Sequence, residues 1–131
     1  MSAGGRQTLV VVDEDTHSLR EIEAIASRWF RVVATRMPGR ALGAVKEDPS
    51  VSVIVADHNL TSVSGISVLQ AAAAIRPATR RLLLAPPSQL ADVIGGVHCG
   101  AVERIIYKPV SAAELSAALF VQTQNNQRKT A

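Results

Sequence analysis

The sequence predicts a single doubly wound α/β domain, in which helices cover both faces of a five-stranded parallel sheet. Five short apolar runs recur along the chain at intervals of about twenty to thirty residues. These runs are almost continuously apolar and rich in β-branched residues, as in strands that are buried on both faces. Segments with helical spacing of their apolar residues lie between them. Such alternation favours an open parallel sheet with right-handed crossovers.

The predicted strands are the five apolar runs, at residues 8–12, 31–34, 51–56, 81–85 and 104–107. The first helix follows the first run, with Thr16 or Ser18 as its expected cap. One face of this helix is predicted to pack on the sheet, and it carries Leu19, Ile22, Ile25, Ala26 and Trp29. Pro38 is suited to open the second helix, and Asp48-Pro49 to end it.

The remaining helices are predicted from apolar spacing and from their end signals. The third covers residues 66–75 and is closed by Pro77. The fourth is expected to be short, at residues 89–94, because Gly95-Gly96 weakens helical structure. Ser111, with Glu114 three residues later, forms a capping box for the fifth.

Composition places the chain among globular proteins with one domain. It has 131 residues, of which 47% are hydrophobic and 19% charged, enough for a core without disulfides or metals. The single Cys99 forms no internal bridge, which fits a reducing compartment. No apolar run approaches the roughly 20 residues of a membrane span, and the start lacks the apolar core of a signal peptide. We therefore expect a cytoplasmic protein without membrane association.

The charge balance does not favour nucleic acid as a direct partner. The formal net charge is +3. The basic residues are spread along the chain without a block of five or six, and no aromatic residues are interleaved with them to stack on bases.

Acidic residues and a lysine follow three of the predicted strands. Asp13-Glu14-Asp15 comes after the first, Asp57 after the third and Lys108 after the fifth. In this fold class the working site lies beyond the carboxyl ends of the strands, so these side chains are expected to converge. Clustered carboxylates repel and call for a cation, and Mg²⁺ suits one or two carboxylates with several waters. A carboxylate beside a metal and a lysine can act as a nucleophile toward phosphorus.

With these residues, the chain resembles the response regulator receiver domain of two-component signalling over residues 8–123. The resemblance rests on Val11-Val12-Asp13-Glu14-Asp15, Asp57, Gly65 and Lys108-Pro109. It implies a flavodoxin-like sheet in the order 2-1-3-4-5, with tails at residues 1–7 and 124–131. The polar C-terminal tail also suits the start of a linker.

The resemblance further implies a role for each matched residue. Asp57 would accept a phosphoryl group from a histidine kinase or phosphotransfer protein, and Lys108 would contact it. Mg²⁺ would be held by Asp13, Glu14, Asp57 and the backbone carbonyl of Asn59. The domain would then act as a signalling module rather than an enzyme, changing an interface with an output domain or target protein.

The family's usual interaction surface is formed by the fourth helix, fifth strand and fifth helix. Here this surface is expected to be apolar and to support a homodimer, with candidates Val93, Ile94, Val97, Ala113, Ala117 and Phe120.

Several positions depart from the family pattern. Ala85 replaces the usual Thr or Ser at the end of the fourth strand, and Pro86 has no backbone N–H to offer a phosphoryl group. Ile105 is the best equivalent of the aromatic switch residue. In the loop after Asp57, Leu60-Thr61 stands where Met-Pro is usual. Two interpretations stay open: phosphorylation of Asp57 with altered signal transmission, or a pseudo-receiver that docks without phosphorylation.

A hydrolase is the alternative from another functional class. Asp13-x-Asp15 after an apolar strand is similar to the haloacid dehalogenase phosphatases, which also use an aspartyl nucleophile and Mg²⁺. That family usually has Thr or Val two residues after the second Asp, where this chain has His17. The chain also lacks room for a substrate-covering cap.

Overall fold

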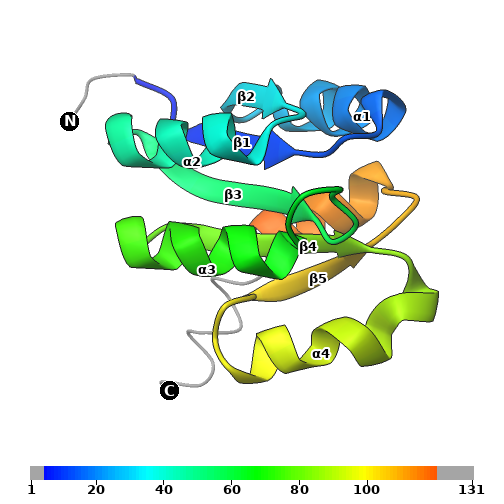
Figure 1. The fold of residues 1–131 in the computed structure, drawn as a ribbon. Coiled ribbons are helices and arrows are strands. Elements are labelled where there is room, and N and C mark those ends of the chain that lie inside the picture. Colours follow the sequence, from blue (N-terminus) through cyan, green and yellow to red (C-terminus); the bar gives the residue numbers. More distant parts are fainter. Residues whose placement is uncertain (1–4, 121–131) are drawn as a thin grey trace, which may run out of the picture.

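The computed structural model describes residues 5–120 and contains one five-stranded parallel sheet (Figure 1). The sheet order is β2-β1-β3-β4-β5, which confirms the predicted 2-1-3-4-5 topology. The strands are β1 (Thr8–Val12), β2 (Arg31–Thr35), β3 (Val51–Asp57), β4 (Arg80–Ala85) and β5 (Arg104–Tyr107). The helices are α1 (Thr16–Ala26), α2 (Pro38–Glu47), α3 (Gly65–Ile75), the short 3-10 turn η1 (Pro87–Gln89) and α4 (Leu90–His98). A C-terminal helix covers residues 112–120; the predicted tail at 124–131 lies outside the described residues.

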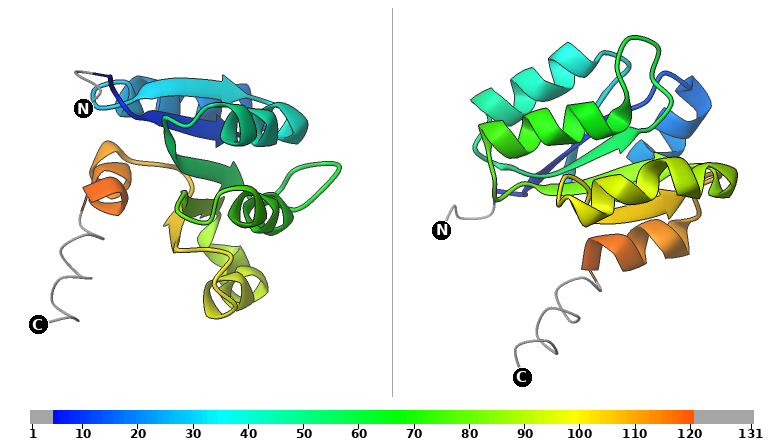
Figure 2. Two further views of the ribbon diagram at one scale, coloured as in Figure 1. Left: turned by 90° about the vertical axis from the view of Figure 1, so that its left-hand side faces the viewer. Right: turned by 60° about the horizontal axis from the view of Figure 1, so that its bottom comes forward.

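The strands alternate their side chains between two separate cores, because successive residues of a strand point to opposite faces of the sheet. In β1, Val10 and Val12 pack with α2 and α3, whereas Leu9 and Val11 pack with α1. The C-terminal helix joins α1 through Leu115, on the other side of the sheet from α3 and α4 (Figure 2). Burial on both faces explains why the strands are nearly continuous apolar runs.

Two expectations for the first helix are wrong. Its cap is Asp15 rather than Thr16 or Ser18: the Asp15 carboxylate accepts a hydrogen bond from the backbone N–H of His17. The helix ends at Ala26, so Trp29 lies beyond it and is 38% exposed. The Trp29 ring instead meets Phe120 edge to face, with 5.2 Å between centroids.

The fourth helix continues through the two glycines that were expected to end it. Gly96 is buried, and a Cβ atom there would lie 2.9 Å from a methyl carbon of Val102 and 3.1 Å from Ile66. A glycine therefore lets α4 approach its neighbours closely, and this packing offsets its low helix propensity.

The expected dimer face is only partly a surface. Val93 is fully buried and Val97 packs against the core beneath α4. Phe120 lies against Trp29, next to the C-terminal end of α1. Of the predicted candidates on α4, only Ile94 is a well-exposed large apolar residue.

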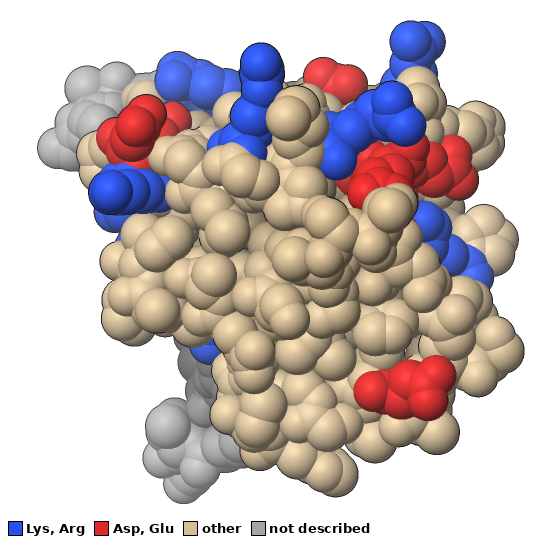
Figure 3. Space-filling model, viewed as in Figure 1, with Lys and Arg blue, Asp and Glu red and all other residues tan. Residues whose placement is uncertain are grey.

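Charged side chains are unevenly distributed over the face that carries α2, α3 and α4. They gather along one margin, while a wide uncharged area covers α3 and α4 (Figure 3). The sequence explains this area, since α3 contains no Asp, Glu, Lys or Arg and α4 contains only Asp92 of these residue types. Within residues 5–120, no helix is both long and apolar enough to cross a membrane.

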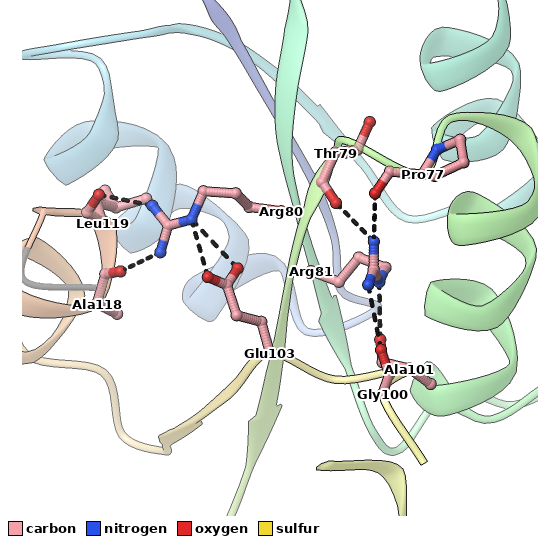
Figure 4. A network of polar contacts seen from close by, with 9 residues as sticks. All are labelled: Pro77, Thr79, Arg80, Arg81, Gly100, Ala101, Glu103, Ala118 and Leu119. Carbon is pink, nitrogen blue, oxygen red and sulfur yellow. Dashed lines mark hydrogen bonds and ion pairs between the residues drawn. The ribbon is translucent and has the colours of Figure 1, made fainter. Parts of the chain in front are cut away.

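Two arginines at the start of β4, Arg80 and Arg81, form hydrogen bonds with segments at the amino-terminal end of the sheet (Figure 4). Arg80 donates to both carboxylate oxygens of Glu103 at 3.2 and 3.3 Å, and to the carbonyls of Ala118 and Leu119 in the C-terminal helix at 2.6 Å. Arg81 donates to four backbone carbonyls: those of Pro77, Thr79, Gly100 and Ala101. These guanidinium groups connect β4 with the loops and helix around it.

Candidate acidic site at the carboxyl edge of the sheet

Asp13, Asp57 and Lys108 meet at the carboxyl edge of the sheet. The Lys108 ammonium donates to Asp13 Oδ2 at 3.0 Å and to Asp57 Oδ1 at 3.2 Å. Each residue is placed by its backbone: Asp57 ends β3, while Asp13 and Lys108 follow β1 and β5 directly. The Lys108 backbone N–H also donates to the carbonyl of Ala85, at the end of β4. The predicted convergence of these three residues is therefore what the structure shows.

Burial makes this cluster electrostatically demanding. Asp13 is fully buried, Asp57 is 4% exposed, and the Lys108 side chain is 18% exposed. Burial, and then repulsion by Asp13, raise the pKa of Asp57 even though Lys108 acts against them. Burial alone would lower the pKa of Lys108, but the hydrogen bonds and charges of the two aspartates outweigh it and raise that pKa. Two carboxylates share one ammonium, so a further cation at this site would be electrostatically favourable.

The other two acidic residues after β1 make different contacts. Asp15 caps α1, and its backbone N–H donates to Asp13 Oδ1 at 2.9 Å. Glu14 contacts the β3–α3 loop: its carboxylate accepts from the Thr61 hydroxyl at 2.6 Å and from the Thr61 backbone N–H at 2.9 Å. The hydroxyl bond is the main reason that the pKa of Glu14 is lowered. Glu14 thus lies beside the Asp13 and Asp57 pair without joining it.

The loop after β3 is fixed at both of its ends. Gly65 donates its N–H to the carbonyl of His58, and a Cβ on Gly65 would lie 2.7 Å from the carbonyl carbon of Asp57. A glycine is therefore required where α3 starts so close to the end of β3. The side chain of Asn59 donates to Gln89 of η1 at 2.9 Å, which leaves the role predicted for the Asn59 carbonyl to its backbone.

Of the positions that depart from the family pattern, Ala85 and Ile105 lie on strands beside the site and Pro86 directly follows β4. Ala85 is fully buried at the end of β4, where its register partner is Tyr107. Pro86 precedes η1, and its carbonyl accepts from the N–H of Gln89. Ile105 pairs in register with Leu83 and packs against the core on the α3 and α4 side. Neither Ala85 nor Pro86 has a hydroxyl or N–H directed at Asp57.

Sequence reasoning missed two residues that organise the site, Thr61 and Gln89. Thr61 was noted as a replacement for proline, but its contact with Glu14 spans 47 positions and leaves no periodic signal. Gln89 was assigned to the start of the fourth helix, and its contact with Asn59 spans 30 positions. Hydrogen bonds between loops depend on how the loops approach one another.

The residues present fit a magnesium ion. The carboxylates of Asp13 and Asp57 are hard oxygen donors of the kind that Mg²⁺ prefers. Among residues 5–120, no group donates a hydrogen bond to Oδ2 of Asp57. This oxygen is also not fully enclosed by the protein. In that part of the chain, no three His, Cys, Asp or Glu side chains are grouped for metal binding. Mg²⁺ needs only one or two carboxylates because it keeps several waters.

Comparisons with known proteins agree with this architecture. The acid tolerance regulatory protein ActR of Rhizobium meliloti is 29% identical over 118 residues, which are 89% of this chain and 60% of ActR. The solved chain of an adenylate cyclase from Rhodopirellula baltica is 25% identical, with a TM-score of 0.80, over 96% of this chain and 99% of that one.

A response regulator protein from Burkholderia pseudomallei has the same fold and was solved with a phosphorylated aspartic acid and a calcium ion. Its TM-score is 0.76 at 21% identity, over 95% of this chain and 73% of that one. The family model of the response regulator receiver domain matches residues 9–120. With its sheet order and its acidic site, the chain belongs to the response regulator receiver domain family.

Proposed function

We propose that this domain receives a phosphoryl group on Asp57 from a histidine kinase or phosphotransfer protein, with Mg²⁺ at the site, and passes the signal through a changed protein interface. One observation carries the proposal: the Lys108 ammonium bonds to the carboxylates of both Asp13 and Asp57. Receiver domains are signalling domains of two-component systems. A cytoplasmic location and an output domain or target protein belong to the same proposal.

In the proposed reaction, an oxygen of the Asp57 carboxylate attacks phosphorus. A new O–P bond forms while the bond between phosphorus and the donor nitrogen or oxygen breaks, and the donor leaves with that electron pair. The attacking oxygen must belong to an ionised carboxylate, a form that Lys108 favours and that burial and Asp13 disfavour. Lys108 keeps a positive charge beside the incoming phosphoryl oxygens.

Bound Mg²⁺ would neutralise charge between the carboxylates and the phosphoryl group. Asp13 and Asp57, together with the Asn59 carbonyl and Glu14, would hold it. The response regulator protein from Burkholderia pseudomallei was solved with both a phosphorylated aspartic acid and a calcium ion, which supports a divalent cation in the proposed site.

A second function, docking without phosphorylation, is favoured by Ala85 and Pro86. A hydrogen bond to a charged group contributes about 1.5–3 kcal/mol, so the missing hydroxyl and N–H remove interactions that would favour a phosphate-bound conformation. On this hypothesis the acidic site remains and the partner recognises the unmodified domain.

Intact mass spectrometry after incubation with Mg²⁺ and acetyl phosphate separates the two functions. We expect the wild-type chain to gain the mass of one phosphoryl group, and Asp57→Asn to gain none. Asp92→Asn, which changes an exposed acid of α4, serves as the matched control and is expected to gain the group. Folded wild-type protein that stays unmodified would contradict phosphoryl transfer and leave docking as the function.

A further inference from the structure

The β3–α3 loop binds the carboxylate of Glu14, one of the residues proposed to hold Mg²⁺. Thr61 presents two donors to Glu14, with the hydroxyl on Oε1 at 2.6 Å and the backbone N–H on Oε2 at 2.9 Å. Both carboxylate oxygens are therefore engaged at once. A carboxylate bonded on both oxygens has fewer lone pairs to offer a cation.

The chemistry of residue 61 allows this contact. A proline, which is usual at this point in the family pattern, has neither a backbone N–H nor a hydroxyl. Threonine supplies both. The contact thus depends on a residue in which this chain departs from the pattern it otherwise follows.

Further contacts hold the two partners in place. Arg36 Nε donates to the backbone carbonyl of Glu14 at 3.0 Å, which fixes the turn after β1. Asn59 donates to Gln89 at 2.9 Å, which holds the same loop to η1. The segments that carry Glu14 and Thr61 are therefore each held by a further hydrogen bond. These contacts keep the Glu14 carboxylate beside the site.

We propose that Thr61 competes with Mg²⁺ for the Glu14 carboxylate and so sets the metal affinity of the site. The inference rests on the proposed metal-assisted function. When a cation takes Glu14, the two bonds to Thr61 break and the β3–α3 loop is released from the β1–α1 turn. Metal occupancy is thereby coupled to the position of the loop that follows Asp57.

Magnesium titration by isothermal calorimetry tests the competition on the full chain. Thr61→Val removes the hydroxyl and keeps the N–H, and Thr61→Pro removes both donors. We expect the dissociation constant for Mg²⁺ to fall about threefold in Thr61→Val and about tenfold in Thr61→Pro, since hydrogen bonds to a charged group are stronger than neutral ones. Ser62→Ala, at an exposed neighbouring hydroxyl, is the matched control and is expected to bind Mg²⁺ as the wild type does.

Amide hydrogen exchange provides a readout that needs no phosphoryl transfer. We expect exchange at the Thr61 amide of the wild type to speed up when Mg²⁺ is added, and to be fast without Mg²⁺ in Glu14→Ala, which has no side-chain acceptor. Unchanged or weaker Mg²⁺ binding in both Thr61 variants, with circular dichroism showing them folded, would overturn the competition. If phosphorylation fails while these variants still bind Mg²⁺ more tightly, the competition stands and the proposed transfer does not.

Discussion

The two ends of β4 use charge in opposite ways. At its start, Arg80 has its guanidinium donors taken by Glu103 and by helix carbonyls. Next to its carboxyl end, Asp57 and Asp13 share the ammonium of Lys108. One end satisfies its charges within the chain, whereas the other keeps two buried carboxylates around one cation.

This difference separates stability from binding. Polar groups that are fully paired by the chain stabilise the fold and have no capacity left for a ligand. A site with more negative than positive charge lowers the stability of the fold until a bound cation balances the charge. The following changes test that contrast, from the largest expected effect to the smallest.

Replacing Arg80 with alanine should have the largest effect on stability. Arg80→Ala removes the hydrogen bonds that Arg80 donates to the Glu103 carboxylate and to the carbonyls of Ala118 and Leu119. We expect the free energy of unfolding to fall by about 3 kcal/mol, measured by urea denaturation. Arg80→Lys keeps the charge without the planar fork, so it should recover only part of the loss. Equal stability of wild type and Arg80→Ala would show that the network contributes little.

Asp57→Asn should have the opposite sign and a smaller size. It removes a charge that burial and Asp13 disfavour, so we expect a gain of about 1 kcal/mol at neutral pH without metal. The folded pKa of Asp57 lies above its unfolded value, so the wild type loses stability as pH rises from below the unfolded pKa through the folded one. Urea midpoints of both proteins across the acidic range should converge at low pH. A wild type that equals or exceeds Asp57→Asn at neutral pH would contradict this account.

Asp15→Ala should lower the stability of the fold and leave the site intact. The expected loss is no larger than the gain expected for Asp57→Asn. The change removes the cap of α1 and should lower the free energy of unfolding by about 0.5–1 kcal/mol. The N–H bond from residue 15 to Asp13 comes from the backbone, so Mg²⁺ affinity should be unchanged in calorimetry. Asp15→Asn, which keeps a capping oxygen, should restore most of the stability. A clear loss of Mg²⁺ binding in Asp15→Ala would place Asp15 in the site.

The Asp15→Ala and Asp15→Asn variants also test the alternative function as a phosphatase. A dehalogenase-like mechanism would need Asp13 and Asp15 together at the reacting centre. In the structure the Asp15 carboxylate faces the start of α1, where His17 and Ser18 donate to it. Membership in the receiver family and the position of Asp57 beside Lys108 favour Asp57 as the acceptor.

The sequence was sufficient to predict the features that depend on the pattern of apolar residues and on short local motifs. The open parallel sheet followed from alternating elements, its strand order from the resemblance to the receiver domain, and the meeting of Asp13, Asp57 and Lys108 from the rule that parallel strands end at one edge. The Ser111 cap was also predicted correctly, since Ser111 Oγ accepts from the N–H of Glu114. These features are local or are imposed by topology.

Features that depend on close approach were missed. Gly96 was expected to stop α4 by propensity, but its contact with Val102 and Ile66 decides otherwise. Trp29 was assigned to the core by periodicity, although the helix ends before it. The Glu14 contact with Thr61 joins two loops, and helical or strand periodicity contains no information about such a meeting.

The distance in sequence between Lys108 and its partners has a consequence for the chain during synthesis. Lys108 is 95 residues from Asp13 and 51 from Asp57. In a nascent chain that ends at β4, native pairing of β1 with β3 would bring both aspartates together without the lysine that bonds to them. The last strand therefore closes the sheet and also relieves the repulsion within it, which favours cooperative folding after residue 108 has left the ribosome.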